Sequence, residues 1–202
     1  MLKLYHSAQS RSTRPRWLLE EIGTPYEVVR LDISKQEHKT PEYMRIHPHG
    51  SVPALMDGDL ALFESAAICA YLADKFPEAR MAPAVGTPER GRYYQWMFYA
   101  MATLEPPVIE VFMHTVMLPE AERSAQAAEH GRTGFAAVAD VLSNALQSKS
   151  FILGERFSAA DVMIGSTLAW SQFMGLLNGR PVLEQYAQRL SARPAYQRAL
   201  AD

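Results

Sequence analysis

Segments that favour β-strands occur only in the first third of the chain, and this uneven distribution constrains the fold more than any other feature. Four short apolar segments read as strands: 2–5, 26–32, 53–57 and 60–63. Helices are predicted at 13–23 and 64–76, with one helical turn around 42–46, and everything beyond residue 88 reads as helix. The sequence therefore predicts a βαβ-α-ββα domain at 1–78, a linker at 79–88 and an all-helical domain at 89–202.

The composition excludes several classes of function. The net charge is -2 and the pI about 6.3, so no basic surface for nucleic acid is expected. No apolar segment approaches the roughly 20 residues that cross a bilayer, and the N-terminus lacks the apolar run of a signal peptide. The single cysteine, Cys69, excludes an internal disulfide, and its apolar neighbours Ile68 and Leu72 predict an inert core residue. We expect a cytoplasmic protein that binds neither nucleic acid nor membrane.

Pro53 interrupts a strand signal. Val52, Ala54 and Leu55 favour a strand, whereas proline lacks the N–H that a central strand needs. An ordinary trans proline at the end of a loop accounts for the pattern, and the residues alone favour that explanation. The alternative is a cis Val52–Pro53 bond, a form found at roughly 5–6% of prolines. It would leave the backbone of Val52 available to an extended peptide.

Glu64 and Ser65 stand at the start of a predicted helix, where unpaired N–H groups and the helix dipole favour anions. An acidic first turn with a capping side chain accounts for the pair by itself. Together with the edge at Val52, however, these groups are complementary to a short zwitterionic peptide. Glu64 would accept its ammonium group, and Ser65 with the helix end would bind a carboxylate.

These residues resemble those of a known family. GSVPAL (50–55) and ESAAICAYLADKFP (64–77), preceded by LYHSAQSRSTRPRWLLEEIGTPYE (4–27), resemble the glutathione-binding half of the cytosolic glutathione transferases. The resemblance is to their bacterial and fungal branch with an SRS-R loop. FILGERFSAADVMIGSTL (151–168) resembles the capping signature of their helical domain. The resemblance implies a thioredoxin-like domain followed by an all-α domain, a homodimer, a cis Val52–Pro53 bond, and glutathione as co-substrate with no other cofactor.

The resemblance also implies roles for individual residues at the glutathione site. The backbone of Val52 beside Pro53 would pair with the cysteinyl part of glutathione, and Glu64 and Ser65 would hold its γ-glutamyl end. For the glycyl carboxylate it implies His38, with Lys39 as the competing candidate. A solvated loop is the other explanation for both residues.

Activation of the glutathione thiol needs a donor near the start of the first helix, and three hydroxyls compete. We rank Ser10 first, Tyr5 second and Ser12 third, because serine-type relatives keep their thiol partner at the position of Ser10. Tyr5 lies near the place of the phenol in tyrosine-type relatives, and Ser12 can instead cap the helix. Arg11 offers a cation that steadies the thiolate or the peptide, or is an exposed loop residue. Cysteine-type relatives have Cys at position 10, so mixed-disulfide chemistry is excluded there.

The motif FSAAD has a structural explanation. Ser158 as N-cap and Asp161 three residues later form a capping box. Phe157 and Val162 are placed as the hydrophobic staple that accompanies it. We assign this motif to folding and not to catalysis.

His47 and His49 have the spacing of possible metal ligands. Pro48 lies between them, and no further ligand cluster is close in the sequence. We therefore expect a loop role for both histidines and no metal site.

The predicted function is a glutathione transferase whose thiolate attacks small apolar electrophiles. Tyr94, Phe98 and Met101 recur at helical spacing and are candidates for electrophile contact, core or dimer interface. Some relatives supply an acidic residue to the partner subunit's glutathione, but Met101 and Thr103 occupy that region here, with Glu105 further on. A glutathione-dependent peroxidase or disulfide reductase stays open, as does a non-catalytic binding module. The absence of a C-x-x-C pair argues against a glutaredoxin-like reductase.

Overall fold

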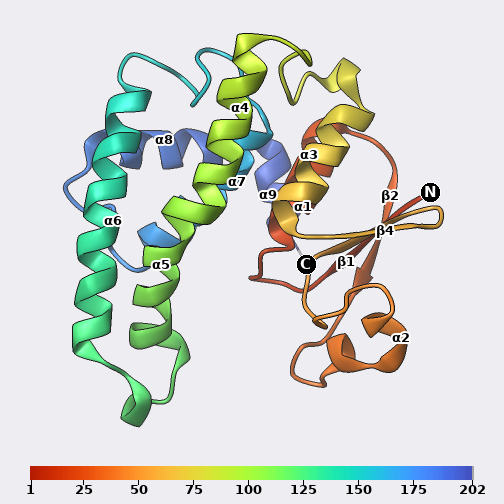
Figure 1. The fold of residues 1–202 in the computed structure, drawn as a ribbon, viewed down its shortest axis with the longest axis horizontal. Helices are drawn as coiled ribbons and strands as arrows, with labels where there is room; N and C mark the ends of the chain where they lie inside the picture. The colour runs from red at the N-terminus through yellow and green to blue at the C-terminus, as the bar shows by residue number, and fades with distance from the viewer. Residues whose placement is uncertain (202) are drawn as a thin grey trace. The chain divides into compact units, whose positions relative to one another are not determined.

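The computed structural model describes residues 1–201 of the chain (Figure 1). These residues form two compact units. Unit 1 contains Met1–Ala82 and the C-terminal segment from Ser191, and unit 2 contains Pro83–Leu190. In chain order, unit 2 therefore lies between two parts of unit 1. Within the described residues, no helix is long and apolar enough to cross a membrane.

Unit 1 is built on a four-stranded sheet with the strand order β2-β1-β3-β4. The strands are β1 Leu2–His6, β2 Tyr26–Arg30, β3 Ala54–Asp57 and β4 Leu60–Phe63. β1 and β2 pair in parallel, and the other neighbours pair antiparallel. All four predicted strands are confirmed, although β1 extends to His6 and β2 ends at Arg30. Pro53 lies just outside β3, so it removes no N–H from the ladder.

Three helices of unit 1 precede the linker: α1 Thr13–Ile22, α2 Pro41–Met44 and α3 Ser65–Lys75. Short 3-10 turns cover Glu37–Lys39 and Pro77–Ala79. α1 ends at Gly23 as predicted, because this residue takes a left-handed conformation with φ 75° and donates its N–H to the Leu19 carbonyl at 2.9 Å. The two longer helices and the sheet share one apolar core, which includes Leu4, Trp17, Leu18, Leu19, Leu55, Ile68, Cys69 and Leu72.

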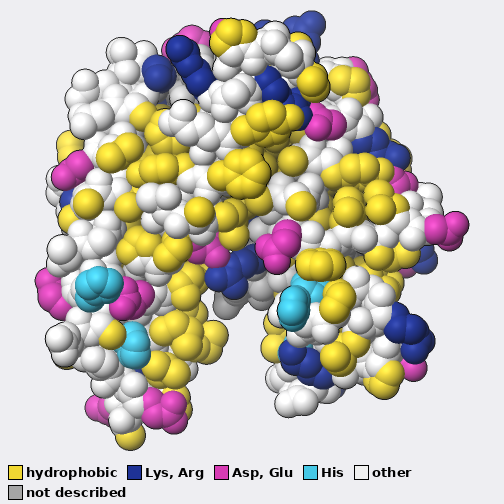
Figure 2. All heavy atoms as spheres, viewed as in Figure 1, with side chains coloured by type: hydrophobic (Ala, Val, Ile, Leu, Met, Phe, Trp, Pro, Cys, Tyr) yellow, Lys and Arg dark blue, Asp and Glu magenta, His cyan; other side chains and the backbone are white. Residues whose placement is uncertain are grey.

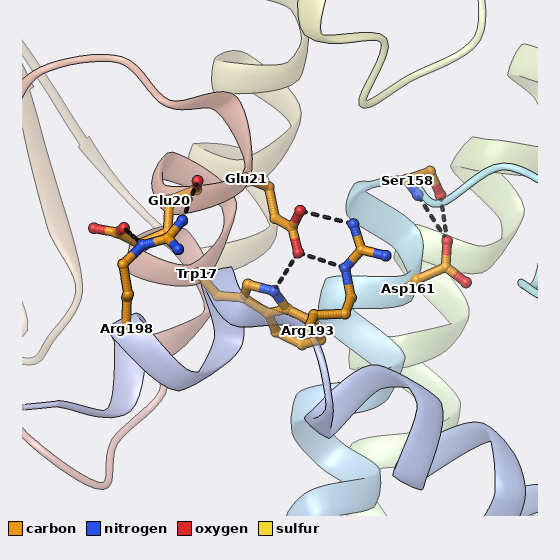
Figure 3. Close-up of polar contacts among 7 residues, drawn as sticks. All are labelled: Trp17, Glu20, Glu21, Ser158, Asp161, Arg193 and Arg198. Atoms are coloured by element: carbon orange, nitrogen blue, oxygen red, sulfur yellow. Dashed lines mark hydrogen bonds and ion pairs between the residues drawn. The ribbon is translucent and has the colours of Figure 1, made fainter.

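The last helix, α9 Pro194–Leu200, belongs to unit 1. Its flanking residue Arg193 binds the Glu21 carboxylate through two hydrogen bonds of 2.5 and 2.7 Å, and Arg198 donates to Glu20 at 2.6 Å (Figure 3). The Trp17 ring meets Tyr196 edge-on at 4.7 Å between ring centroids. The sequence places all of 89–202 in one helical domain, whereas the structure attaches its last residues to α1.

Unit 2 is built from helices, with one isolated β-bridge between Phe151 and Gly154. Its α-helices are α4 Pro88–Tyr99, α5 Glu105–Phe112, α6 Ala125–Leu146, α7 Ala159–Phe173 and α8 Pro181–Ser191. Two π-helical segments, Ala100–Leu104 and Met113–Met117, follow α4 and α5, and Glu120–Glu122 forms a 3-10 turn. α4, α5 and the π segments thus form one almost continuous helical path. The prediction of a helical region after the linker is confirmed.

α5 and α6 approach each other closely at Gly131. A Cβ atom built on this residue would lie 2.8 Å from the Pro107 carbonyl oxygen and 2.9 Å from a methyl group of Val111. Real Cβ contacts are not this short, and one of the two atoms is backbone that cannot turn aside. The absence of a side chain at Gly131 therefore allows this helix pair to pack.

Gly131→Ala is expected to lower the free energy of unfolding by about 1–3 kcal/mol, because the added methyl group overpacks the helix interface. Gly91→Ala is the matched control, since Gly91 lies in α4 with no atom within 4 Å of its built Cβ. That substitution is expected to stabilise by about 0.5–1 kcal/mol through helix propensity. Urea unfolding of both variants measures the difference. If Gly131→Ala were no less stable than Gly91→Ala, the close approach of α5 and α6 at Gly131 would be contradicted.

The predicted capping box at the start of α7 is confirmed. The Asp161 carboxylate accepts hydrogen bonds from the backbone N–H of Ser158 at 2.8 Å and from its hydroxyl at 2.9 Å (Figure 3). It also accepts from the Ile152 N–H at 2.8 Å and from the Tyr186 hydroxyl at 2.7 Å. Burial raises the pKa of Asp161, and these four donors act in the opposite direction. The carboxylate thus joins the loop before α7, the start of α7 and α8.

Candidate functional site

The strand register brings three sequence-predicted segments to one edge of the sheet. Tyr5 pairs with Ala54, and Ala54 pairs with Phe63. The residues that follow β1, precede β3 and follow β4 therefore leave the sheet at the same edge. These are the loop 7–12, the pair Val52–Pro53 and the pair Glu64–Ser65. The Val52–Pro53 bond is cis, which confirms the implication of the family resemblance and corrects the trans form favoured by the residues alone.

The sequence predicts that this helix begins at Glu64. In the structure α3 begins one residue later, at Ser65, and Glu64 directly precedes it. Its backbone has φ 71° and ψ 110°, a conformation that is uncommon for a residue with a side chain. Such positions cluster at ligand sites, where the surrounding structure holds them. The Glu64 side chain is exposed at the sheet edge and can reach a ligand.

Ser65 is buried, with 3% of its surface exposed, and its hydroxyl accepts a hydrogen bond from Arg14 Nη1 at 3.2 Å. Arg14 is itself buried in the first turn of α1. The contact joins the starts of α1 and α3 across 51 residues of sequence. Arg14 was not predicted as a site residue, although it lies in the segment 4–27 that carries the family resemblance, because no local pattern connects it to Ser65.

The two serines of the loop before α1 differ in access. Ser10 is half-buried, whereas Ser12 is completely buried. Their hydroxyl oxygens lie 2.6 Å apart, and Ser10 donates to the Ser7 carbonyl at 2.7 Å. Ser12 stands at the N-cap position, but its side chain does not cap α1 as the sequence suggested. Its oxygen lies instead 2.7 Å from His6 Nδ1 and accepts the Ser7 N–H at 3.1 Å. Of the two, Ser10 has the access that a ligand requires.

Tyr5 and Arg11 are also half-buried near this edge. The Tyr5 ring lies 5.3 Å from the Tyr43 ring, centroid to centroid, in a tilted arrangement. Tyr43 donates its hydroxyl to the Ser51 carbonyl at 2.5 Å, which fixes the loop that leads into Val52. Tyr5 thus packs against Tyr43, the residue that holds this loop.

His38 and Lys39 lie in the 3-10 turn before α2. Lys39 donates its ammonium group to the His49 carbonyl at 3.0 Å. The Nδ1 atom of His38 is buried and has no hydrogen-bond partner among the described residues. Gly50 has φ 52°, and a Cβ on it would lie 2.5 Å from the His38 carbonyl oxygen, so this turn packs directly against the loop before β3.

His47 and His49 lie in the same loop, with ring centroids 6.2 Å apart, and the His47 ring lies 5.0 Å from that of Phe63. Burial, with a smaller contribution from His49, lowers the pKa of His47. Within residues 1–201, no group of three His, Cys, Asp or Glu side chains is arranged to hold a metal ion. The packing of His47 against Phe63 gives the loop role that the sequence predicts.

Cys69 lies in the core of unit 1, where burial raises the pKa of its thiol to about 12. It is therefore protonated at neutral pH and cannot act as a nucleophile. The predicted core role is confirmed.

Unit 2 carries the residues suggested for electrophile contact. Tyr94 and Phe98 on α4 are exposed, with 41% and 71% of their surfaces accessible. Met101 is half-buried in the π segment after α4, and Glu105 is buried at the start of α5. Figure 2 shows hydrophobic side chains gathered over α4 and α5 on this face of the unit. Such an apolar surface suits contact with an apolar molecule.

A β2-β1-β3-β4 sheet with a cis proline before β3, followed by a helical unit, is the architecture of a thioredoxin-like domain joined to an all-α domain. Residues 1–74 match the family model "Glutathione S-transferase, N-terminal domain", and residues 125–189 match "Glutathione S-transferase, C-terminal domain". Glutathione S-transferase F11 of Arabidopsis thaliana is 31% identical over 217 residues, covering 99% of this chain and 97% of the relative. The chain belongs to the glutathione S-transferase family.

Solved structures agree with this assignment. The glutathione transferase URE2P6 from Phanerochaete chrysosporium, in complex with oxidized glutathione, has a TM-score of 0.87 at 28% identity, over 98% of this chain and 94% of that one. A family member from Pseudomonas fluorescens with two glutathione bound has the same TM-score and identity, over 98% of this chain and 92% of that one. Both relatives share the fold along almost their whole length.

Proposed function

We propose that the protein is a glutathione transferase that binds glutathione along the sheet edge formed by the loop 7–12, Val52 and Glu64–Ser65. The observation that carries this proposal is the convergence of these three segments at one edge of a chain of this family. They combine an accessible hydroxyl, a backbone outside the strand ladder, an exposed carboxylate and the N-terminus of a helix. These groups are complementary to the thiol, the peptide backbone, the ammonium group and a carboxylate of glutathione.

At the γ-glutamyl end, the Glu64 carboxylate binds the ammonium group, and Ser65 with the N–H groups of α3 binds the carboxylate. The buried Arg14 holds the Ser65 hydroxyl at 3.2 Å and adds positive charge beside this anion. The backbone of Val52 pairs with the cysteinyl residue. His38 binds the glycyl carboxylate in preference to Lys39, whose ammonium group already donates to His49.

Ser10 activates the thiol by donating a hydrogen bond to its anion. A cysteine thiol has a pKa near 8.5, and lowering it by about 2 units requires about 2.7 kcal/mol of preference for the thiolate. One hydrogen bond to a charged group contributes about 1.5–3 kcal/mol, so a single well-placed hydroxyl is sufficient. The thiol proton leaves to solvent, and the thiolate attacks a small apolar electrophile. With an aryl halide, a carbon–sulfur bond forms while halide leaves with the electron pair of the broken bond.

Calorimetric titration with glutathione, followed by turnover with a chlorodinitrobenzene, tests this function. We expect saturable binding and formation of the glutathione conjugate. Binding without conjugation, but with reduction of a hydroperoxide, would identify the peroxidase alternative. Binding without either reaction would identify the non-catalytic module.

Ser65→Ala is expected to raise the KM for glutathione about tenfold or more, with a smaller effect on kcat, because this contact holds ground state and transition state alike. Steady-state kinetics with glutathione as the varied substrate measure the two constants separately. Ser51→Ala is the matched control, because Ser51 is exposed on the same edge and contributes its backbone carbonyl to Tyr43. An unchanged KM for Ser65→Ala would show that glutathione binds elsewhere.

We also propose, from the family resemblance, that the protein acts as a homodimer in the cytoplasm. Sedimentation equilibrium of the purified chain tests the dimer, with a mass of twice 22.6 kDa as the expected result. A monomer that conjugates glutathione would contradict the dimer and leave the proposed reaction intact.

A further inference from the structure

A buried chain of hydrogen bonds leads from Ser10 into the interior of unit 1. Ser10 Oγ lies 2.6 Å from Ser12 Oγ, and Ser12 Oγ lies 2.7 Å from His6 Nδ1. His6 Nε2 lies 3.0 Å from Arg16 Nη1, and Arg16 Nη2 donates to the Ala201 carbonyl at 2.5 Å. His6, Ser12 and Arg16 are all at least nine-tenths buried. The site described above uses only the first member of this chain.

The direction of the hydrogen bonds follows from the chemistry of the groups. A guanidinium group only donates, so His6 Nε2 accepts from Arg16. The imidazole is therefore neutral and carries its hydrogen on Nδ1, which donates to Ser12 Oγ. Ser12 Oγ also accepts the Ser7 N–H at 3.1 Å, which fills both of its lone pairs. The Ser12 hydrogen has two acceptors within reach, the Ser7 carbonyl at 3.0 Å and Ser10 Oγ at 2.6 Å. Because both lone pairs of Ser12 are filled, Ser10 cannot donate to it, so the hydrogen in the 2.6 Å contact comes from Ser12.

With the hydrogen bonds in this direction, the Ser10 hydroxyl can act only as a donor. Ser10 Oγ accepts the hydroxyl hydrogen of Ser12 and also the Ser12 backbone N–H at 3.2 Å, so both of its lone pairs are occupied. What remains is its own hydrogen, which the Ser7 carbonyl accepts at 2.7 Å. A hydroxyl in this state donates to a thiolate but accepts nothing from a thiol. This chain of hydrogen bonds therefore favours binding of the glutathione thiolate over binding of the neutral thiol.

We propose that His6 and Arg16 are positioning residues that keep Ser10 as a pure donor and thereby favour the glutathione thiolate. The proposal rests on the proposed function, because it assigns these residues to the same thiol site. No proton travels along the chain: on thiolate binding, the Ser10 hydrogen turns from the Ser7 carbonyl to sulfur, and the thiol proton goes to solvent. Each bond in the chain polarises the next, which strengthens the donor at its end.

Arg16 interacts with groups that are far apart in the sequence. Besides donating to the Ala201 carbonyl, it acts electrostatically on Glu20 of its own helix and on Tyr26 of β2, and in both it favours the charged form. Burial, followed by the Glu20 contact, raises the pKa of Tyr26 well above its ordinary value, so its phenol remains neutral at neutral pH. The guanidinium group of Arg16 therefore interacts with α1, β2 and Ala201, and its Nη1 atom contacts His6.

The test is the pH midpoint of thiolate formation in the glutathione complex, followed by the ultraviolet absorbance of the thiolate. His6→Leu removes the donor to Ser12, so Ser12 and Ser10 can reverse their hydrogen bonds. We expect the midpoint to rise by about 0.5–1 pH unit, which is about three- to tenfold less thiolate below the midpoint. His6→Asn places an amide N–H near the position of Nδ1, and we expect it to restore at least half of the shift. Arg16→Met releases Nε2, lets imidazole change its tautomer, and is expected to raise the midpoint as well.

S-methylglutathione, which has no thiol to ionise, separates this proposal from the proposed function. If the unmodified protein binds neither glutathione nor this analogue, the proposed function fails. If it binds both and the His6→Leu midpoint is unchanged, only the positioning role fails. Leu19→Ala is the control for loss of core packing in α1, since Leu19 is fully buried and its side chain is apolar. Equal shifts of the pH midpoint in Leu19→Ala and His6→Leu would overturn the proposal. If His6→Leu does not fold, a midpoint that is unchanged in both His6→Asn and Arg16→Met would also overturn it.

Discussion

Ser10→Ala is expected to lower kcat/KM for the electrophile by about 10- to 30-fold at pH 7 and saturating glutathione. If the bound thiol has a pKa about 2 units below 8.5, roughly three-quarters of it is thiolate at pH 7, and without the donor only about 3% is. The difference disappears above about pH 9, where the thiol ionises without help. The pH profile of kcat/KM for the electrophile measures this change, because at saturating glutathione it reports groups in the glutathione complex.

Tyr5→Phe is the matched control for the Ser10 variant, since each substitution removes one hydroxyl near the same edge. We expect Tyr5→Phe to leave the profile in place and both variants to bind S-methylglutathione within about twofold of the unmodified protein. A profile that moves for Tyr5→Phe and not for Ser10→Ala would make the phenol the donor. If neither variant moves it, the activating group is Ser12, Arg11 or the backbone N–H groups at the start of α1.

Asp161→Ala is expected to lower the free energy of unfolding by at least about 3 kcal/mol. The substitution leaves the N–H groups of Ile152 and Ser158 and the hydroxyl of Tyr186 without their acceptor, and each buried unsatisfied group costs about 1–3 kcal/mol. Most single substitutions cost about 0.5–3 kcal/mol, so a loss at or above the top of this range indicates a broken buried network. Chemical denaturation followed by circular dichroism measures the change.

Two further variants provide smaller expected losses of stability for comparison with Asp161→Ala. Ser158→Ala removes one donor and keeps the others, so about 1 kcal/mol is expected. Asp140→Ala removes an acidic side chain that is 71% exposed and paired with Arg180, and less than about 1 kcal/mol is expected. If Asp161→Ala costs no more than Asp140→Ala, the network contributes little to stability, and the motif would need another explanation.

The elements that could be predicted from the sequence are those fixed by local chemistry. Gly23 ends α1 in a left-handed conformation, and Gly58, with φ 60°, forms the turn between β3 and β4. Both features depend only on residues that are close in the sequence, so they are predictable. The capping box at Ser158 spans three residues and is also local. The hairpin of β3 and β4, which brings Val52 and Glu64 close together, is local as well, whereas the place of Ser10 beside them was implied by the family resemblance.

The support of the site could not be predicted, because it depends on contacts between distant segments. Arg14 meets Ser65 across 51 residues of sequence, and Arg16 meets Ala201 across 185. His6 reads as the first residue of a polar loop, yet it is buried at the end of β1 because Ser12 and Arg16 satisfy both ring nitrogens. Nothing in the spacing of charged residues along a helix shows which of them turn inward.

The attachment of α9 to α1 has a consequence for how the protein is made. During synthesis, the sheet and its first helices emerge early, but Trp17, Glu20 and Glu21 wait for partners at 193–198, which are made more than 170 residues later. Arg16 waits as well, because its carbonyl acceptor is residue 201. The nascent thioredoxin-like half is therefore incomplete until residue 201 has been made, and a chain truncated before α9 would have a whole sheet but would lack one of the supports of Arg16.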